Sequence, residues 1–410
     1  MKSKPLTIYL LLILIIGFAT PSISFAANIG KAKMVLGKVM IVNAQGAKKR
    51  LRRGSKISVG DTIITSQRGQ AQLTMIDGTK ISVRPASSFK IDEFIATGKK
   101  EDQKTYYNLI KGGFRSVTGK IGKNNKTSFK LNTPVATMGI RGTDFTGKFC
   151  ANDCPASAGK NGLFVDVISG GISMTNNGGT FNFNKDSNGY VSDSSQSPRV
   201  IPELPDNLLS PKAKKSKNGR KRNKNRYPSP EEETIQIGLF IAPNNKKEIL
   251  SEAMEAGVPP AQIMRGADSA GLNAKDFVPD LIKKGKELGM EPSEFVAPIL
   301  DSGMNGENII GRMMRAYPNS ASDILTAAFA TGDMDNKRLK QSALNAGISS
   351  TDIESADTVG NLFALPPEVK KLLDTPKSEK SNNNPSEEKR NIRSRELNPG
   401  TDSGEVASPS

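Results

Sequence analysis

Cys150 and Cys154 are the two cysteines of this 410-residue chain, and their type and spacing could support chemistry. They lie in the short polar stretch Phe-Cys-Ala-Asn-Asp-Cys-Pro. Two thiols cannot complete a zinc site in a chain that has no histidine. A redox pair is the other functional interpretation, but the spacing is not Cys-x-x-Cys. The pattern therefore favours a small structural disulfide.

The absence of histidine also excludes the commonest forms of catalysis, because neither a Ser-His-Asp nor a Cys-His system can be built. A carboxylate-dependent hydrolase would have only the common acidic dipeptide Asp92-Glu93 to support it. Residues 113–121 resemble a phosphate loop superficially, but their glycines are wrongly spaced and Ile121 stands where a hydroxyl residue is needed. We therefore expect no enzymatic activity, cofactor, metal site or small-molecule substrate.

The chain is strongly basic, with 58 Lys and Arg against 41 Asp and Glu, and the charge is unevenly distributed. Residues 27–200 carry a net charge of +16, residues 201–230 carry +7, and residues 231–371 carry −7. The two larger regions could dock on each other, or the basic one could meet an external polyanion. The candidate polyanion contacts in the middle segment are Lys212, Lys214, Lys215, Lys217, Arg220, Lys221, Arg222, Lys224 and Arg226. The alternative without a binding role is that such basic runs form a solvated surface.

Residues 1–26 have the pattern of an export signal, with lysines at the start, an apolar stretch and small residues before Ala27. An uncleaved membrane anchor is the alternative. No cysteine lies near the cleavage site, so a lipid anchor there is not expected. The mature chain is expected to be periplasmic, or secreted or displayed at the cell surface.

Three regions with different patterns follow the signal. Residues 27–200 contain short alternating runs, about every 8–12 residues, with turn residues between them, which is typical of an all-β sandwich, barrel or solenoid. Residues 201–230 are basic and contain five prolines, so we expect an extended linker. Residues 372–410 are rich in Ser, Asn, Pro and Glu and are predicted to be a disordered tail.

Residues 231–371 show helical periodicity and a repeat in which a glycine ends each helix. Gly257 and Gly289 are 32 positions apart, as are Gly271 and Gly303. This is the length of a helix pair in an α-solenoid. We expect an all-α domain of short helical repeats, with a compact irregular bundle as the less specific alternative.

The β half resembles the FecR-type domain family of bacterial periplasmic sensor proteins over about residues 35–195. The match rests on residues 37–39, 60–73, 77–91, 133–145 and 165–174, in the family's order and spacing. The most characteristic string is Thr-Pro-Val-Ala-Thr-Met-Gly-Ile-Arg-Gly-Thr-Asp-Phe at residues 133–145. The resemblance implies a β-rich, solenoid-like or sandwich-like module that meets other proteins without catalysis. The best-known relatives carry an anti-sigma segment and a transmembrane helix before this domain, whereas only the signal precedes residue 27 here.

The end of this string, which we call the signature, comprises Arg141, Gly142, Thr143, Asp144 and Phe145. Arg141 and Asp144 are close enough in sequence to form a bidentate pair across the turn, which would make the signature architectural. Alternatively, the two charges lie at the surface and contact a partner.

Together these features predict an exported, non-catalytic interaction or sensing module of the bacterial cell envelope. It would bind a protein partner through its FecR-type domain and its helical repeats. The alternative is an envelope protein that binds a polyanion such as lipopolysaccharide, acidic glycan or nucleic acid through the basic β domain and linker.

Overall fold

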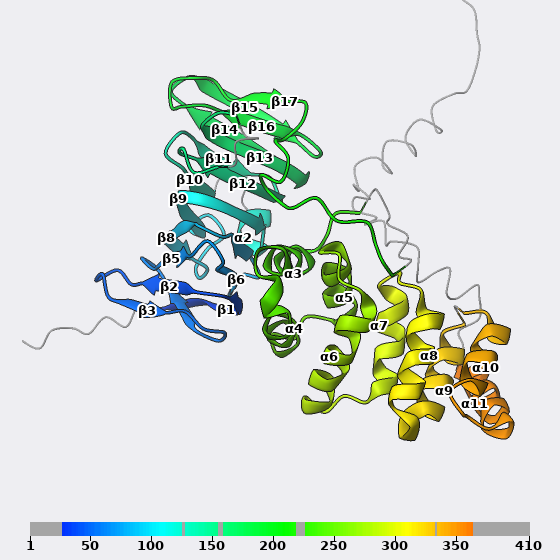
Figure 1. Cartoon of the computed structure of the whole chain (residues 1–410). Helices are drawn as coiled ribbons and strands as arrows, with labels where there is room; N and C mark the ends of the chain where they lie inside the picture. Colours follow the sequence, from blue (N-terminus) through cyan, green and yellow to red (C-terminus); the bar gives the residue numbers. More distant parts are fainter. Residues whose placement is uncertain (1–26, 125–127, 155–158, 219–225, 333, 364–410) are drawn as a thin grey trace, which may run out of the picture.

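A computed structural model describes residues 27–124, 128–154, 159–218, 226–332 and 334–363. Strands occupy the first half and helices the second, and the two regions lie side by side (Figure 1). The predicted order of an all-β region followed by an all-α region is confirmed. The signal at 1–26 and the tail at 372–410 lie outside the described residues.

The β region is a two-layered structure whose strands belong to one continuous 17-stranded sheet. The first layer has the order β4-β1-β6-β7-β9-β12-β13-β16-β17, and the second has the order β3-β2-β5-β8-β9-β10-β11-β14-β15. The strands are β1 (Asn28–Leu36), β2 (Val39–Val42), β3 (Lys48–Arg50), β4 (Lys56–Ser58), β5 (Thr62–Thr65), β6 (Gln70–Met75), β7 (Lys80–Val83), β8 (Ser88–Ile95), β9 (Lys104–Val117), β10 (Phe129–Asn132), β11 (Thr137–Ile140), β12 (Asp144–Cys150), β13 (Gly162–Ser169), β14 (Gly171–Asn176), β15 (Gly179–Asn184), β16 (Asn188–Val191) and β17 (Arg199–Ile201). The chain alternates between the layers mostly in pairs of strands, so the fold combines sandwich and solenoid character.

Strand β9 joins the two layers. Its first half pairs with β8 and, in parallel, with β10, whereas its second half pairs with β7 and β12. The strand changes layer at Gly112, whose φ is +81°. A Cβ there would lie 2.3 Å from the hydroxyl of Ser87, so this crossing requires glycine.

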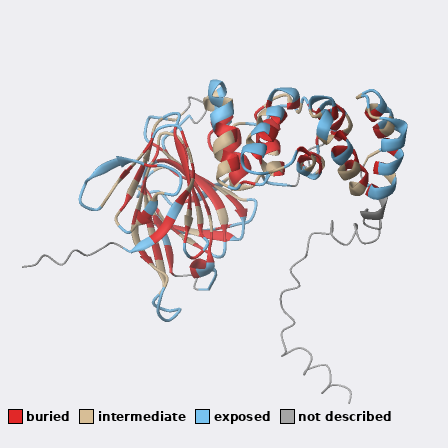
Figure 2. Ribbon diagram, turned by 90° about the horizontal axis from the view of Figure 1, so that it is seen from below, coloured by how far each residue is buried: buried red, intermediate tan, exposed pale blue. Residues whose placement is uncertain are grey.

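The core of the β region lies between the layers, where alternate side chains of each strand point inward. Figure 2 shows these buried positions along the inner faces of the sheet. The core contains a closed ring of five aromatic side chains in which each neighbouring pair of rings lies 5.3–6.3 Å apart. In order around this ring they are Phe89, Tyr107, Phe129, Phe145 and Phe114.

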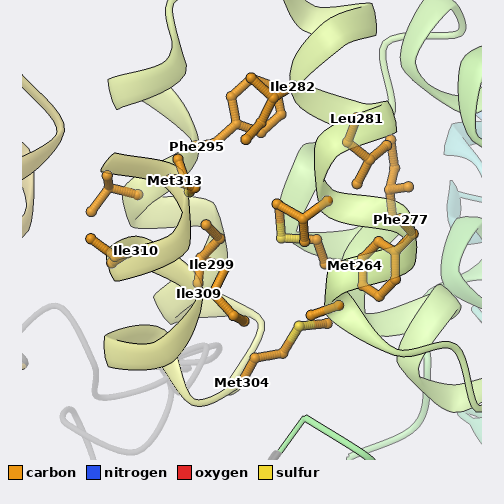
Figure 3. Close-up of a cluster of buried hydrophobic side chains, with 14 of the residues drawn as sticks. Met264, Phe277, Leu281, Ile282, Phe295, Ile299, Met304, Ile309, Ile310 and Met313 are labelled. Atoms are coloured by element: carbon orange, nitrogen blue, oxygen red, sulfur yellow. The ribbon is translucent and has the colours of Figure 1, made fainter. Parts of the chain in front are cut away.

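The helical region is a short α-solenoid. Its helices are α3 (Pro230–Ile241), α4 (Lys246–Glu255), α5 (Pro260–Ser269), α6 (Ala274–Glu287), α7 (Val296–Asp301), α8 (Gly306–Ala316), α9 (Ala321–Thr331), α10 (Asn336–Leu344) and α11 (Ser350–Phe363). The odd-numbered helices stack on one another in one row, and the even-numbered helices form a second row beside them. Their buried side chains form one continuous core, and Figure 3 shows the part of it around α5 to α8.

Glycines end the helices as the repeat predicted. Gly257, Gly271, Gly289, Gly303 and Gly347 all have φ between +68° and +86°. After four of these glycines, the next residue donates its N–H to a carbonyl oxygen five positions earlier, as in Met290 to Gly285. This arrangement satisfies carbonyl groups that the end of the helix leaves free.

Between β17, which ends at Ile201, and α3, which begins at Pro230, the described linker residues form neither helix nor strand, and the segment packs against both domains. Leu208 is buried beside Phe164, Tyr190 and Cys150. Further along, the N–H of Lys214 donates to the carbonyl of Ser269, and the Asn218 amide donates to Asp268. These contacts attach the linker to both domains, while Lys212, Lys214, Lys215 and Lys217 remain exposed.

No helix in the described ranges is both long and apolar enough to cross a membrane.

Candidate interaction site at the domain interface

The helical domain begins with three consecutive glutamates at the interface with the β domain. Ser229 caps α3 by accepting a hydrogen bond from the N–H of Glu232, and Pro230 occupies the first turn. Acidic residues suit a helix N-terminus because of the helix dipole. Here, however, Glu231, Glu232 and Glu233 are only 3%, 2% and 6% exposed, which is unusual for ionisable side chains. Their burial requires cationic partners.

Two of the glutamates pair with cations from the first layer of the β domain. Glu231 lies 2.8 Å from the Nζ of Lys80 and 3.7 Å from that of Lys33. Glu233 accepts a hydrogen bond of 2.7 Å from Arg84 and one of 3.0 Å from Arg115. The acidic helix is therefore bound to the basic domain of the same chain.

Glu232 pairs instead with two arginines outside the β domain. Arg226, at the end of the linker, donates two hydrogen bonds of 2.8 and 2.9 Å to its two carboxylate oxygens. Arg265 of α5 donates a third, of 2.7 Å. This carboxylate fixes the linker to the first repeat.

Arg115 is the central cation of the interface and is 2% exposed. Its Nε and Nη2 donate to the two oxygens of Asp144 at 2.9 and 2.8 Å. Its Nη1 donates to Glu233 and, at 2.9 Å, to the carbonyl of Pro228. Burial would lower the pKa of Arg115, but the two carboxylates outweigh it and raise that pKa. The guanidinium group stays charged.

The same cluster shifts the pKa of two acids in opposite directions. Burial would raise the pKa of Glu233, but the charges of Arg84 and Arg115 lower it to about 2. Asp166 of β13 lies nearby and has no such pairing. Burial, together with the charge of Glu233, raises its pKa to about 6.

Apolar side chains also cross the interface. Met34 and Leu36 of β1 belong to the core of the helical domain, where they join Ile235, Leu239 and Ile249. The amide of Gln70 donates to the carbonyl of Thr234 at 2.6 Å. The helical domain thus packs on the part of the first layer formed by β1, β6, β7 and the second half of β9, through charged, polar and apolar contacts together.

The signature forms a corner in which four of its five residues have structural roles. Gly142 has a φ of +64°. Thr143 is buried, donates from its hydroxyl to the carbonyl of Gly171 at 2.6 Å and exchanges hydrogen bonds with Thr118. The Phe145 ring packs edge-on against Phe114 at 5.3 Å. Arg141 remains exposed.

The predicted pair between Arg141 and Asp144 is wrong. Arg115 donates hydrogen bonds to both carboxylate oxygens of Asp144 instead. Strands β9 and β12 pair so that Thr146 is opposite Arg115, which places Asp144 diagonally across from Arg115 on the same face. Proximity in sequence could not reveal this cross-strand partner.

The candidate polyanion contacts are divided among three environments. Arg226 is paired with Glu232, and Lys212 lies 2.7 Å from Asp206. Lys214 lies over the ring of Phe240, whereas Lys215 and Lys217 are exposed. Arg220, Lys221, Arg222 and Lys224 lie outside the described residues.

Cys150 and Cys154 form a disulfide, with their Cα atoms 5.4 Å apart. Cys150 is 1% exposed and packs beside Phe164, so this bond anchors the end of β12 to the core. In the described part of the chain, no cluster of three or more His, Cys, Asp or Glu side chains is arranged to hold a metal ion.

Sequence reasoning missed Arg84, Arg115 and the three glutamates as a site. The string Ser-Pro-Glu-Glu-Glu at residues 229–233 was the available signal, since it combines a helix start with three negative charges in a chain whose other domain is basic. The opposite net charges of the two regions indicated docking as one possibility, but they did not indicate which residues would take part.

Comparison with known proteins agrees with the resemblance seen in the sequence. The family model described as "FecR protein" matches residues 61–173, which run from the start of β5 into β14. Among curated proteins, no match to the chain is found.

Solved structures show weaker similarity. Two structures of a "putative anti-sigma factor" from Parabacteroides distasonis ATCC 8503 are each 13% identical to this chain, with TM-scores of 0.27 and 0.28. Each match covers 35% of this chain and 60% of that one, so the chain spans less than two thirds of those proteins. A solved "Cell surface anchoring domain" is 26% identical over 15% of this chain and 82% of its own length, with a TM-score of 0.15. The match of the family model, which contains the signature and Arg115, identifies residues 61–173 as a FecR domain.

Proposed function

We propose that this protein is an exported, non-catalytic interaction or sensing module of the bacterial cell envelope, in which a FecR domain and a helical repeat domain act as one rigid unit on a protein partner. The observation that carries this proposal is the buried cluster of Arg84, Arg115, Asp144 and Glu233. It connects the signature directly to the first helix of the repeats. A partner that contacts either domain would therefore meet a fixed arrangement of both.

The charge distribution supports a protein partner over a polyanion. The helical domain itself neutralises Lys33, Lys80, Arg84 and Arg115, which are basic residues of the first layer. These cations are therefore paired within the molecule and do not form a free basic patch. Docking within the molecule accounts for part of the charge asymmetry along the chain.

The proposal is tested by capture of envelope proteins on the full chain at about 0.5 M salt, where attractions between exposed charges are largely screened. We expect a discrete protein to be retained, and Arg141→Glu to reduce its capture, because Arg141 is the exposed charge of the signature. The matched control is Arg68→Glu, the same charge change on an exposed residue of the turn between β5 and β6. Capture that vanishes at this salt concentration for the unmodified chain contradicts the proposal.

One observation favours polyanion binding as a second function. All three residues of β3, Lys48, Lys49 and Arg50, are exposed, and Arg52 beside them is exposed as well. If this strand binds a polyanion, the logarithm of affinity for heparin should fall linearly with the logarithm of salt concentration. Replacing Lys48 and Lys49 by Glu should flatten the slope, and an unchanged slope contradicts this function.

A further inference from the structure

A pocket of about 370 Å³ lies between α6 and α8 in the helical domain. Adjacent helices of the even row pack closely elsewhere, as α4 does with α6 and α8 with α10, but α6 and α8 make little direct contact. Three residues that line it, Ile282 of α6 and Ile309 and Met313 of α8, also belong to the core drawn in Figure 3. The pocket therefore occupies a break in the packing of the solenoid.

The pocket has a cationic rim. Lys217 from the linker, Lys275 from α6 and Arg312 from α8 contribute to its lining, and all three are exposed. None of the described residues that line the pocket is Asp or Glu. This is notable in a domain whose net charge is negative, and among the described residues none of the three cations has a carboxylate partner. The rim is therefore complementary to an anionic ligand.

Two asparagine amides on the α8 side are free to bind a ligand. Asn305 and Asn308 line the pocket, and in the described part of the chain neither side chain forms a hydrogen bond. An asparagine amide can accept from one backbone N–H and donate to one backbone C=O, which matches the edge of an extended peptide. Asn218 also lines the pocket, but its side chain already forms hydrogen bonds with Asp268, Leu272 and Ala274 and has a structural role.

The base of the pocket is apolar. Val278 and Ile282 of α6 and Ile309 and Met313 of α8 line it, and they are 1–8% exposed. A volume of about 370 Å³ falls within the range of ligand sites and can take one large side chain with its flanking backbone. Methionine suits such a surface because its flexible side chain adapts to different shapes.

We propose that this pocket binds a short, extended segment of a partner protein in which carboxylates flank one large apolar side chain. The carboxylates pair with Lys217, Lys275 and Arg312, and the backbone pairs with Asn305 and Asn308. The apolar side chain packs on the base. This site rests on the proposed protein-binding function and gives it a location and a partner chemistry. The asparagine amides favour a peptide over a fatty acid, whose chain offers no polar groups for them.

The first experiment measures fluorescence anisotropy of a labelled peptide, Gly-Asp-Glu-Phe-Asp-Glu-Gly, titrated with the full chain. We expect saturable binding that weakens at least tenfold when the acids are replaced by Asn and Gln. We also expect a tenfold loss when Phe is replaced by Gly. Absence of saturable binding, or equal binding of the peptide without Phe, overturns the proposal. Displacement of the peptide by decanoate at lower concentration than by unlabelled peptide overturns it in favour of an anionic lipid.

Matched variants then locate the binding. The double variant Lys275→Glu, Arg312→Glu should weaken peptide binding at least tenfold. The control Lys283→Glu, Arg315→Glu makes the same charge change on exposed residues of the same two helices outside the pocket and should stay within twofold. Equal losses in both variants overturn the site. Thermal unfolding of each variant shows that it is folded.

Capture from the envelope separates this inference from the function on which it rests. If the full chain still retains a discrete protein at high salt but binds none of the peptides, only the pocket proposal fails. If the chain retains no protein, the proposed function itself fails.

Discussion

Arg115 contacts Asp144 with one edge of its guanidinium group and Glu233 with the other. The first carboxylate belongs to the FecR domain and the second to the helical domain, 118 residues away from Arg115 in the sequence. Because an arginine presents several donors in one plane, it can bind two carboxylates without leaving either incompletely paired. This single side chain is the point at which the signature and the repeats meet.

Removal of the charge of Glu233 should destabilise the whole molecule. Glu233→Gln leaves Arg84 and Arg115 buried with one carboxylate fewer, and breaking a buried ion pair from one side costs about 3–5 kcal/mol. Urea unfolding at pH 7 measures the loss. The control is Glu354→Gln on the exposed surface of α11, which should change the free energy of unfolding by less than about 0.5 kcal/mol. Equal effects of the two variants would show that the cluster contributes no stability.

The lowered pKa of Glu233 should make stability depend on acid. Its pKa is 4.5 ordinarily and about 2 in the folded protein, so the folded state binds this proton less readily than the unfolded state. The contribution, about 3 kcal/mol, is therefore complete above pH 4.5 and is lost as the pH falls toward 2. Unfolding measured between pH 3 and pH 6 should show this loss, and it should be smaller in Glu233→Gln. A variant with the same acid sensitivity as the unmodified chain would contradict the assignment.

Ionisation of Asp166 should change the stability in the opposite direction to ionisation of Glu233. Its folded pKa of about 6 lies above the ordinary 3.8, because burial and the charges of Glu233 and Asp186 disfavour its ionised form, whereas Arg84 and Arg115 favour it. Stability should therefore decrease as the pH rises from about 4 to 6 through this group. Asp166→Asn removes that cost, so it should raise the melting temperature at pH 7.5 by about 2 °C and have little effect at pH 4. An effect independent of pH would indicate a cause other than ionisation.

The sequence predicted those parts of the fold whose patterns are local. The glycines at helix ends fixed the positions of the repeats, because a positive φ at the end of a helix depends on one residue. The short alternating runs that predict an all-β first half correspond to strands such as β5 and β7, each of which is a short apolar run beside a turn. Strand β9 is harder to recognise, because Gly112 and Gly113 interrupt its alternation.

The candidate site was less predictable, because its partners are far apart in the chain. Asp144 belongs to the signature, but its partner Arg115 is set by strand pairing, and the contact of Arg115 with Glu233 is set by docking of the domains. The opposite net charges of the two regions left two possibilities. The regions could dock on each other, or the basic region could bind an external polyanion. Which of the cations would be buried depended on the face that α3 covers, and that information is absent from local patterns.

Arg141 and Asp144, the two charged residues of the signature, should differ in their effect on stability. Asp144→Asn weakens a bidentate pair to a buried arginine and should lower the free energy of unfolding by about 1.5–3 kcal/mol. Arg141→Glu changes an exposed residue and should alter it by less than about 0.5 kcal/mol. Urea unfolding of both variants makes the comparison. Comparable destabilisation by both would restore a structural role for Arg141.

The apolar contacts of β1 should make the two domains unfold together. Leu36→Ala removes a side chain that is 4% exposed and packs in the core of the helical domain, so it should cost about 2–4 kcal/mol. Because the contact also holds the domains together, calorimetry should show one transition for the unmodified chain and a broader or divided transition for the variant. The control Leu131→Ala removes a leucine with 0% exposure from the interior of the β domain, away from the interface. This control should lower the free energy of unfolding by a similar amount, because the same side chain is lost. Calorimetry should still show one transition, because β1 still holds the two domains together. Two separate transitions in the unmodified chain would show that the domains fold independently despite their shared core.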